Sequence, residues 1–176
     1  MSTTRTMGIE VTDVSTTQRL PLGFEYHSPA SPADSTTVET GSQVWVYVFN
    51  DDPTNAFVAG AVVYRLPAST TEDFFGGHAT PITTHQPQVM CIGVAQHAIP
   101  TGSYGFVLKR GVGLILSGSA GVAADSPFTS GGDEVGSVLV WADDASGAWG
   151  SNISVIGHTA TAIGADTTGT AYISCG

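Results

Sequence analysis

Residues Ile92–Leu116, IGVAQHAIPTGSYGFVLKRGVGLIL, decide the fold of this chain. The stretch consists of apolar runs separated by turn signals at Pro100–Ser103 and at Arg110–Gly111. Proline and glycine favour chain reversals, because proline fixes φ and glycine tolerates a positive φ. The pattern therefore predicts strand, turn, strand, turn and strand. It contains no recognisable catalytic motif.

Similar short runs recur on both sides of this stretch, and none has the 3.6-residue periodicity of a helix. The run Val44–Phe49 is apolar on both faces, which predicts a strand covered on both sides. The other runs are Phe57–Leu66, Gly136–Trp141, Ile153–His158 and Thr170–Ser174. Strands of this length between turn signals predict an all-β fold, either an antiparallel β-barrel or a β-sandwich.

The composition restricts the partners. The chain has 176 residues, a formal net charge of −10 and only five lysines and arginines. Nucleic-acid binding depends on clustered basic side chains, so we expect no nucleic-acid partner. No apolar run approaches the roughly 20 residues of a membrane-spanning helix, and we expect no membrane partner. The length is typical of one domain.

The two cysteines are too few to indicate a disulfide framework. Cys91 lies in the apolar run Val89–Ile92, which predicts a buried thiol. A bond to Cys175 would require the C-terminal strand to lie beside Cys91.

The N-terminal residues predict an extended arm over residues 1–21, followed by a single domain over residues 22–176. The arm carries only scattered apolar side chains, too few to bury a core of its own. We expect it to bind a partner by adding a strand to a sheet edge; the alternative is a frayed terminus. The candidate contact residues here are Met7, Ile9, Val11, Val14, Leu20 and Leu22.

Two further segments are candidates for partner binding. Residues Pro67–Pro87 form a long, weakly patterned loop that contains Phe74 and Phe75. Loops of this length in compact domains are often functional. Trp149 lies between small residues in the polar segment Asp143–Asn152, which is typical of an interface anchor.

Sequence motifs of catalysis are absent. Around Ser119 the residues are Ser117–Gly121, SGSAG, which lacks the first glycine of a nucleophile elbow. The histidines lack the short spacings of a metal site, and the acidic pairs lack the spacing of a calcium loop. We therefore expect no catalytic residue, no metal and no cofactor.

Two groups of residues carry a resemblance to a known family. Pro21–Gly23 followed by Gly41–Val48, GSQVWVYV, resembles the opening of small bacteriophage head decoration or capsid-associated virion proteins. Ile92–Gln96 and Ile99–Val107 resemble the core of the same proteins, with Phe106 where the family usually has tryptophan. The matching segments all lie between Pro21 and Val107.

The resemblance implies a capsid decoration, or cement, protein of a bacteriophage. Such a protein binds the outer capsid surface and stabilises the shell by bridging major capsid subunits, without catalysis. By the same analogy we expect a homo-oligomer, a trimer, located on the virion surface after assembly in the host cytoplasm. Two alternatives remain: another virion component such as a tail or fibre protein, and a carbohydrate-binding module that uses Trp149.

Overall fold

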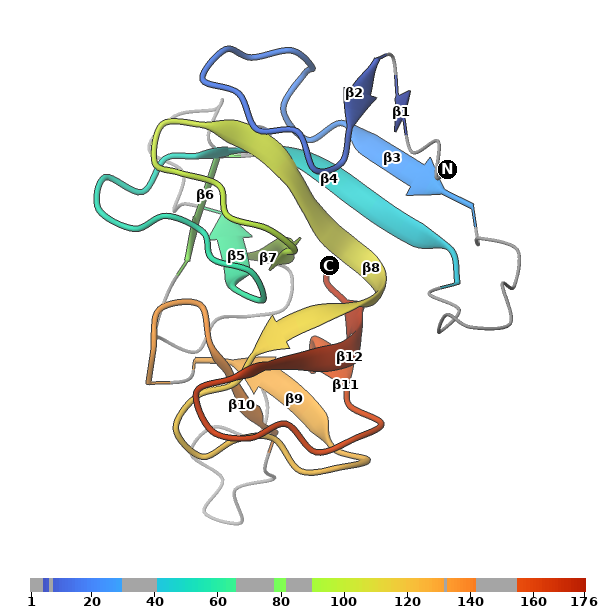
Figure 1. The fold of residues 1–176 in the computed structure, drawn as a ribbon, viewed down its shortest axis with the longest axis vertical. Helices are drawn as coiled ribbons and strands as arrows, with labels where there is room; N and C mark the ends of the chain where they lie inside the picture. The colour runs from blue at the N-terminus through green and yellow to red at the C-terminus, as the bar shows by residue number, and fades with distance from the viewer. Residues whose placement is uncertain are drawn as a thin grey trace.

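The computed structural model describes residues 5–6, 8–29, 41–65, 78–81, 90–131, 133–141 and 155–176. These residues form strands and turns, with no α-helix among them, and no helix there could cross a lipid bilayer. The strands are β1 (Arg5–Thr6), β2 (Ile9–Glu10), β3 (Glu25–Ser28), β4 (Gln43–Asn50), β5 (Val62–Arg65), β6 (His78–Pro81), β7 (Cys91–Ala95), β8 (Tyr104–Leu116), β9 (Pro127–Ser130), β10 (Val138–Val140), β11 (Gly157–His158) and β12 (Thr168–Ser174) (Figure 1).

The predicted all-β class is confirmed. Ten strands form one sheet in the order β10-β9-β11-β12-β8-β7-β5-β6-β4-β3, and β1 and β2 form a separate pair. The pairing is antiparallel except between β4 and β6. Strands β3 and β10 lie at the ends of the order, so the sheet is open and folds over itself in a sandwich-like arrangement. An additional pairing between β8 and β4 makes a circuit of neighbouring strands, β8, β7, β5, β6 and β4, within this sheet.

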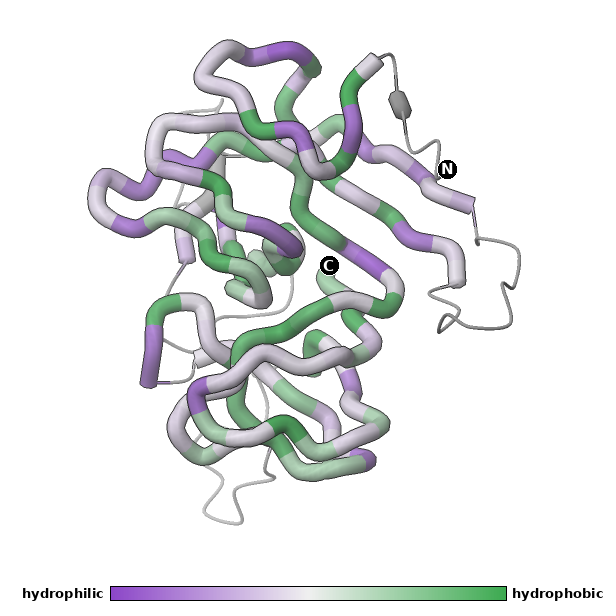
Figure 2. Tube along the Cα trace, in the orientation of Figure 1, coloured by the Kyte–Doolittle hydropathy of each residue, from purple (hydrophilic) through white to green (hydrophobic). Residues whose placement is uncertain are grey.

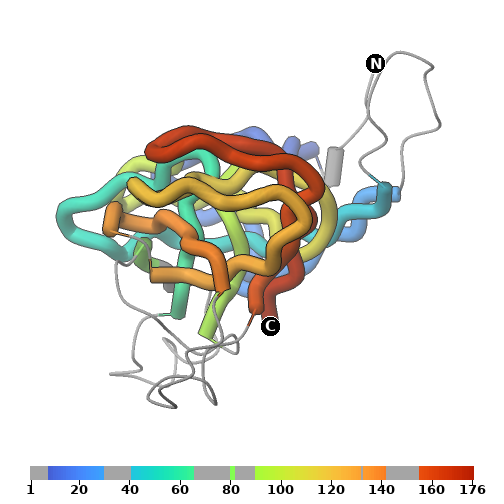
Figure 3. Tube along the Cα trace, turned by 90° about the horizontal axis from the view of Figure 1, so that it is seen from below, coloured from blue at the N-terminus to red at the C-terminus, as the bar shows by residue number. Residues whose placement is uncertain are grey.

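Strand β8 connects the two parts of the molecule. Its first half, up to Arg110, pairs with β4, and from Arg110 to Leu116 it pairs with β12. The strand bends where its pairing partner changes from β4 to β12, and Gly111 at the bend has φ 126° (Figure 1). Viewed from below, the C-terminal strands lie in front of the N-terminal part, so the two parts stack along the long axis (Figure 3).

This continuity corrects the prediction of two strands separated by a turn at Arg110–Gly111. Glycine accepts the positive φ that the bend requires, so the chain changes direction without leaving the sheet. The hydrophobic colouring of β8 is interrupted by hydrophilic residues at the bend (Figure 2). There Lys109 Nζ lies 2.8 Å from Glu25 Oε1 of β3, and Arg110 is exposed.

Buried side chains form two clusters. Strand β4 contributes to both, because successive side chains of a strand point to opposite faces. Trp45 and Tyr47 belong to the larger cluster, which extends into the C-terminal part, whereas Val46 and Val48 belong to the smaller one. The expectation that this strand is covered on both sides is confirmed. The smaller cluster comprises Val46, Val48, Phe57, Val63, Ile92, Ala95, Ile99 and Val107.

The predicted burial of Cys91 is confirmed, but the residue is not a free thiol: it forms the bond to Cys175 that the sequence left as an alternative. The two Cα atoms are 5.4 Å apart, and both residues are buried in the larger cluster. The physical reason is the course of β12. This strand runs beside β8 until the backbone amide of Cys175 donates to Lys109 O at 2.9 Å. That contact brings the chain end next to β7.

Candidate partner-binding surface

The N-terminal segment after Gly8 packs onto the body of the molecule. Ile9, Val11 and Leu20 are 8%, 8% and 6% exposed, in the same core cluster as Trp45. Leu22 is partly buried against that cluster. In this conformation these side chains contact their own chain.

Backbone pairing fixes the same segment. Ser15 and Tyr104 exchange two hydrogen bonds, of 3.1 Å from the Ser15 amide and 2.8 Å from the Tyr104 amide. Ser15 thus forms an antiparallel bridge to the start of β8. The sequence predicts that this segment binds a partner by adding a strand to the edge of the partner's sheet. In the structure, the strand that the segment pairs with, β8, belongs to the same chain.

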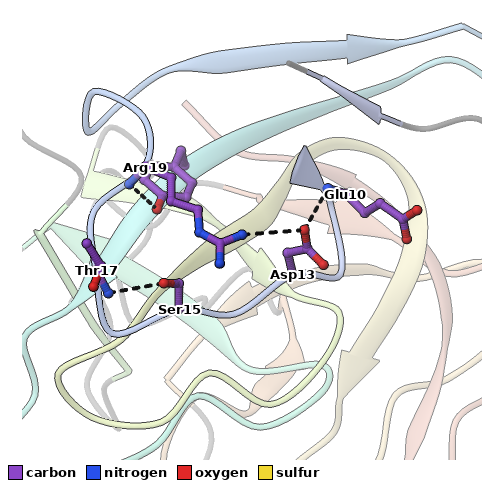
Figure 4. A network of polar contacts seen from close by, with 6 residues as sticks. Glu10, Asp13, Ser15, Thr17 and Arg19 are labelled. Atoms are coloured by element: carbon purple, nitrogen blue, oxygen red, sulfur yellow. Dashed lines mark hydrogen bonds and ion pairs between the residues drawn. The ribbon is translucent and has the colours of Figure 1, made fainter. Parts of the chain in front are cut away.

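A polar network shapes the turn that carries Val14 (Figure 4). The Glu10 amide donates to Asp13 Oδ2 at 3.0 Å, and the Asp13 amide donates to Glu10 O at 3.0 Å. Arg19 Nη1 lies 4.0 Å from Asp13 Oδ2, and its backbone amide donates to Tyr47 Oη at 3.2 Å. The turn is therefore held at both ends, with Val14 37% exposed.

Asn50, at the end of β4, is a fully buried hydrogen-bonding centre. Its Nδ2 donates to Asn55 O at 3.0 Å and to Ile99 O at 2.9 Å, and its Oδ1 accepts from the Asp52 amide at 3.1 Å. Its backbone exchanges hydrogen bonds with Ser103 O and the Gly102 amide, both of 2.9 Å. One asparagine thus fixes the loop after β4 to the turn before β8.

Asp52 organises the same loop from its other side. Its Oδ1 accepts from the amides of Thr54 and Asn55, at 2.8 and 2.7 Å, and its Oδ2 accepts from Thr80 Oγ1 at 2.6 Å. Burial alone would raise the pKa of Asp52, but these hydrogen bonds outweigh it and hold the pKa well below the ordinary 3.8. Asp52 therefore stays ionised as a structural anchor.

These elements meet at one end of the molecule, at the upper left of Figure 1. We call it the loop end and define it by residues Val14–Arg19, Asn50–Asn55 and Pro100–Ser103. It contains a shallow depression lined by Phe49, Asn50, Asp51, Asp52, Pro53, Thr101 and Gly102. Because buried hydrogen bonds hold the loop that follows β4, the shape of this surface is preformed.

The described part of the chain contains no group of three or more His, Cys, Asp and Glu side chains that could hold a metal ion. Both Asp52 oxygens already accept hydrogen bonds from the chain. Two other titratable groups lie in the interior: burial lowers the pKa of His97 and raises the pKa of Tyr64 to about 12. Nε2 of His97 is buried and has no hydrogen-bond partner among the residues that the structure describes.

The structure places only some of the predicted contact residues. Val14 is exposed and Leu22 is partly buried, whereas Ile9, Val11 and Leu20 are buried. Met7, Phe74, Phe75 and Trp149 lie outside the described residues. Partner binding by those four residues stays a prediction, as does a carbohydrate-binding role for Trp149.

Sequence reasoning missed the two centres of the loop end. The run Asn50–Pro53, NDDP, predicts only the end of a strand, yet Asn50 and Asp52 are its most connected side chains. A usable signal was present: Asp followed by Thr54 and Asn55 is the pattern of a side chain that accepts from backbone amides two and three residues on.

Comparison with known proteins gives one informative similarity. No protein-family model matches the chain, and no curated protein matches it. A solved structure described as the head fiber gp8.5 N base in bacteriophage phi29 is similar, with a TM-score of 0.50 and 11% sequence identity. The similarity covers 75% of this chain and 94% of that chain. At this identity it shows a shared fold.

Proposed function

We propose that this protein is a structural component of a bacteriophage virion. The observation that carries the proposal is the fold, which the chain shares over 94% of the length of a phage head-fibre base. The motifs at Gly41–Val48 and Ile92–Gln96, which resemble those of head-associated virion proteins, support it independently. A role in binding, without catalysis, accords with a surface whose polar groups are engaged in holding loops.

Within the virion we propose a decoration role on the outer capsid surface. The protein would bind the major capsid protein and bridge neighbouring subunits, as a homo-oligomer, a trimer by family analogy. Each contact can be weak, because the second contact becomes effectively intramolecular once the first is made. A component that binds only the assembled shell stabilises it by mass action.

The second candidate is the base of a fibre attached to the phage head. The description of the similar structure favours it, because that protein is the base of a head fibre. A fibre base and a cement protein both contact the shell. They differ in what they carry: a fibre base supports a further fibre segment, whereas a cement protein connects subunits.

Quantitative mass spectrometry of purified particles tests the proposal. A decoration protein should be present in a fixed, high ratio to the major capsid protein, and shells stripped of it should disassemble at lower temperature. A copy number of only a few per particle, with unchanged shell stability on removal, would favour the fibre base. Absence from purified particles would reject a virion role altogether.

A matched pair of variants tests the loop end as the contact surface. Val14 and Val155 are 37% and 38% exposed, and lie on the N-terminal segment and before β11 respectively. We expect Val14→Glu to weaken binding to shells lacking the protein by about tenfold or more, because a charge would be desolvated at the contact. Val155→Glu should bind like the wild type. Equal binding by both variants would remove the loop end from the contact.

A further inference from the structure

The disulfide bond joins two strands that are not neighbours in the sheet. Cys91 lies at the start of β7 and Cys175 follows β12, and β8 separates these strands in the sheet order. The bonded residues are 84 positions apart in the sequence. The bond therefore spans β8 near its bend and connects the N-terminal part of the molecule to its last strand.

Noncovalent contacts hold both cysteines in place. Strand β12 pairs with β8 over seven consecutive residues, from Thr168 to Ser174. Next, the Cys175 amide donates to Lys109 O at 2.9 Å. On the other side, Cys91 is paired with Tyr64 of β5. The pairing of β12 with β8 and of β7 with β5 thus determines where the two sulfur atoms meet, and the fold does not depend on the bond to bring them together.

Access to the bond depends on the residues that follow β12. Both cysteines are 3% exposed, whereas the next residue, Gly176, is exposed. Breaking the hydrogen bond between Cys175 and Lys109 releases reduced Cys175 from β8, while the seven paired residues of β12 stay in place. Such a local opening costs far less free energy than global unfolding. A small reagent can therefore reach Cys175 in the folded protein.

We propose that this bond is a redox-dependent staple, formed after folding by exchange with a small disulfide such as glutathione disulfide. The Cys175 thiolate attacks the oxidant, releases one glutathione thiolate and forms a mixed disulfide. The Cys91 thiolate then attacks the sulfur of Cys175 and releases the second glutathione. Two protein thiols are oxidised, the oxidant is reduced to two glutathiones, and these take up the two protons.

The protein would therefore exist in two states of the same fold, one with the disulfide bond and one without it. In a reducing compartment the thiols persist and the residues after Ser174 can leave β8; in an oxidising medium the bond holds them in place. The staple would thus act when the protein moves from a reducing to an oxidising environment. This inference does not rest on the virion role, since it concerns the isolated chain.

The test uses the full-length chain purified with a reductant. We expect the reduced protein to keep its β-type circular dichroism spectrum, and glutathione disulfide to consume both thiols without unfolding it. Oxidation should raise the Tm by about 5 to 15 °C and slow hydrogen exchange in the peptide covering β12. Cys175→Ser should show the reduced behaviour with or without the oxidant.

Any one of three results would overturn the proposal. The first is that the reduced wild-type chain is unfolded, and the second is that its thiols survive glutathione disulfide in the folded state. The third is that oxidation leaves hydrogen exchange in β12 unchanged. The reduced wild type is itself a reference, so the test stands even if Cys175→Ser fails to fold.

Discussion

The side chain of Gln96 forms two hydrogen bonds with the backbone of Leu114. The Leu114 amide donates to Gln96 Oε1 at 2.7 Å, and Gln96 Nε2 donates to Leu114 O at 3.1 Å. Gln96 directly follows β7, and an amide side chain offers one acceptor and donors, as a peptide group does. The backbone of β7 pairs with Val107 and Leu108 before the bend of β8, and the Gln96 side chain adds a contact to Leu114 beyond the bend.

Replacing Gln96 should show how much its two hydrogen bonds to Leu114 contribute to the free energy of unfolding. Gln96→Ala leaves the Leu114 amide and carbonyl without these partners, and we expect a loss of about 1 to 3 kcal/mol in the free energy of unfolding. Urea denaturation measures it. Gln43→Ala is the matched control, because Gln43 Nε2 donates one hydrogen bond, to Val112 O at 2.8 Å. A larger loss for Gln43→Ala would contradict the role of Gln96.

Removing the charge of Asp52 should loosen the loop end. Asp52→Asn replaces one acceptor oxygen by a donor that faces other donors, so we expect a loss of about 1.5 to 3 kcal/mol. Asp166→Asn, at an exposed turn, should change stability by less than about 0.5 kcal/mol. Comparison of the two urea midpoints gives the difference. Indistinguishable midpoints would show that the Asp52 network contributes little.

The same carboxylate predicts a pH dependence. The folded-state pKa of Asp52 lies below its ordinary value of 3.8. The unfolded chain therefore binds this proton more readily, so the stabilisation is complete above about pH 5 and decreases as pH falls below the ordinary value. Denaturation of wild type and Asp52→Asn between pH 3 and 7 should converge at the acid end. Parallel curves would mean that Asp52 is not responsible.

His97 should add an acid-sensitive step at higher pH. Burial lowers its pKa below 6.5, so the folded chain holds the imidazole neutral while the unfolded chain protonates it. Stability should be complete above pH 6.5 and decline as pH falls toward the lowered pKa. His97→Gln should flatten the thermal-shift profile between pH 5 and 7, whereas the exposed His158→Gln should leave it unchanged. A persistent slope in His97→Gln would refute this origin.

Gly93 should be intolerant of any side chain. A Cβ atom there would lie 2.8 Å from Leu108 O and 2.9 Å from Val107 Cγ2, closer than packed atoms allow. Overpacking of this kind typically costs about 1 to 3 kcal/mol. We expect Gly93→Ala to lower the Tm. At exposed Gly164 the only atom near an added Cβ is Thr167 Oγ1 at 3.5 Å, so Gly164→Ala should be neutral.

These positions explain what could be predicted from the sequence. The strand at Val44–Phe49 was predictable because both its faces are covered, and a short continuous run of apolar residues indicates burial on both sides. The motif around Ile92–Gln96 could be located but not explained. Gly93 and Gln96 are determined by close approach to β8, and contacts between distant segments leave no local pattern.

The bend of β8, the disulfide and the loop end depend equally on tertiary context. Arg110–Gly111 has the composition of a turn, and only the arrival of β12 beside it makes a continuous strand. Asn50 reaches Ile99 across 49 residues, a contact that no spacing within one segment indicates. Burial of Ile9 and Val11 likewise requires the larger core cluster, which the composition of the N-terminal segment alone cannot reveal.

The shared strand β8 has a consequence for force transmission. If the two stacked parts are pulled apart along the axis of β8, the force acts in shear on the seven residue pairs between β8 and β12. All seven pairs must then separate together. Strand β3 pairs with β4 alone among the described strands, so it can instead be separated one residue pair at a time. The protein should therefore resist tension between its parts far better than a pull that lifts β3 from its edge.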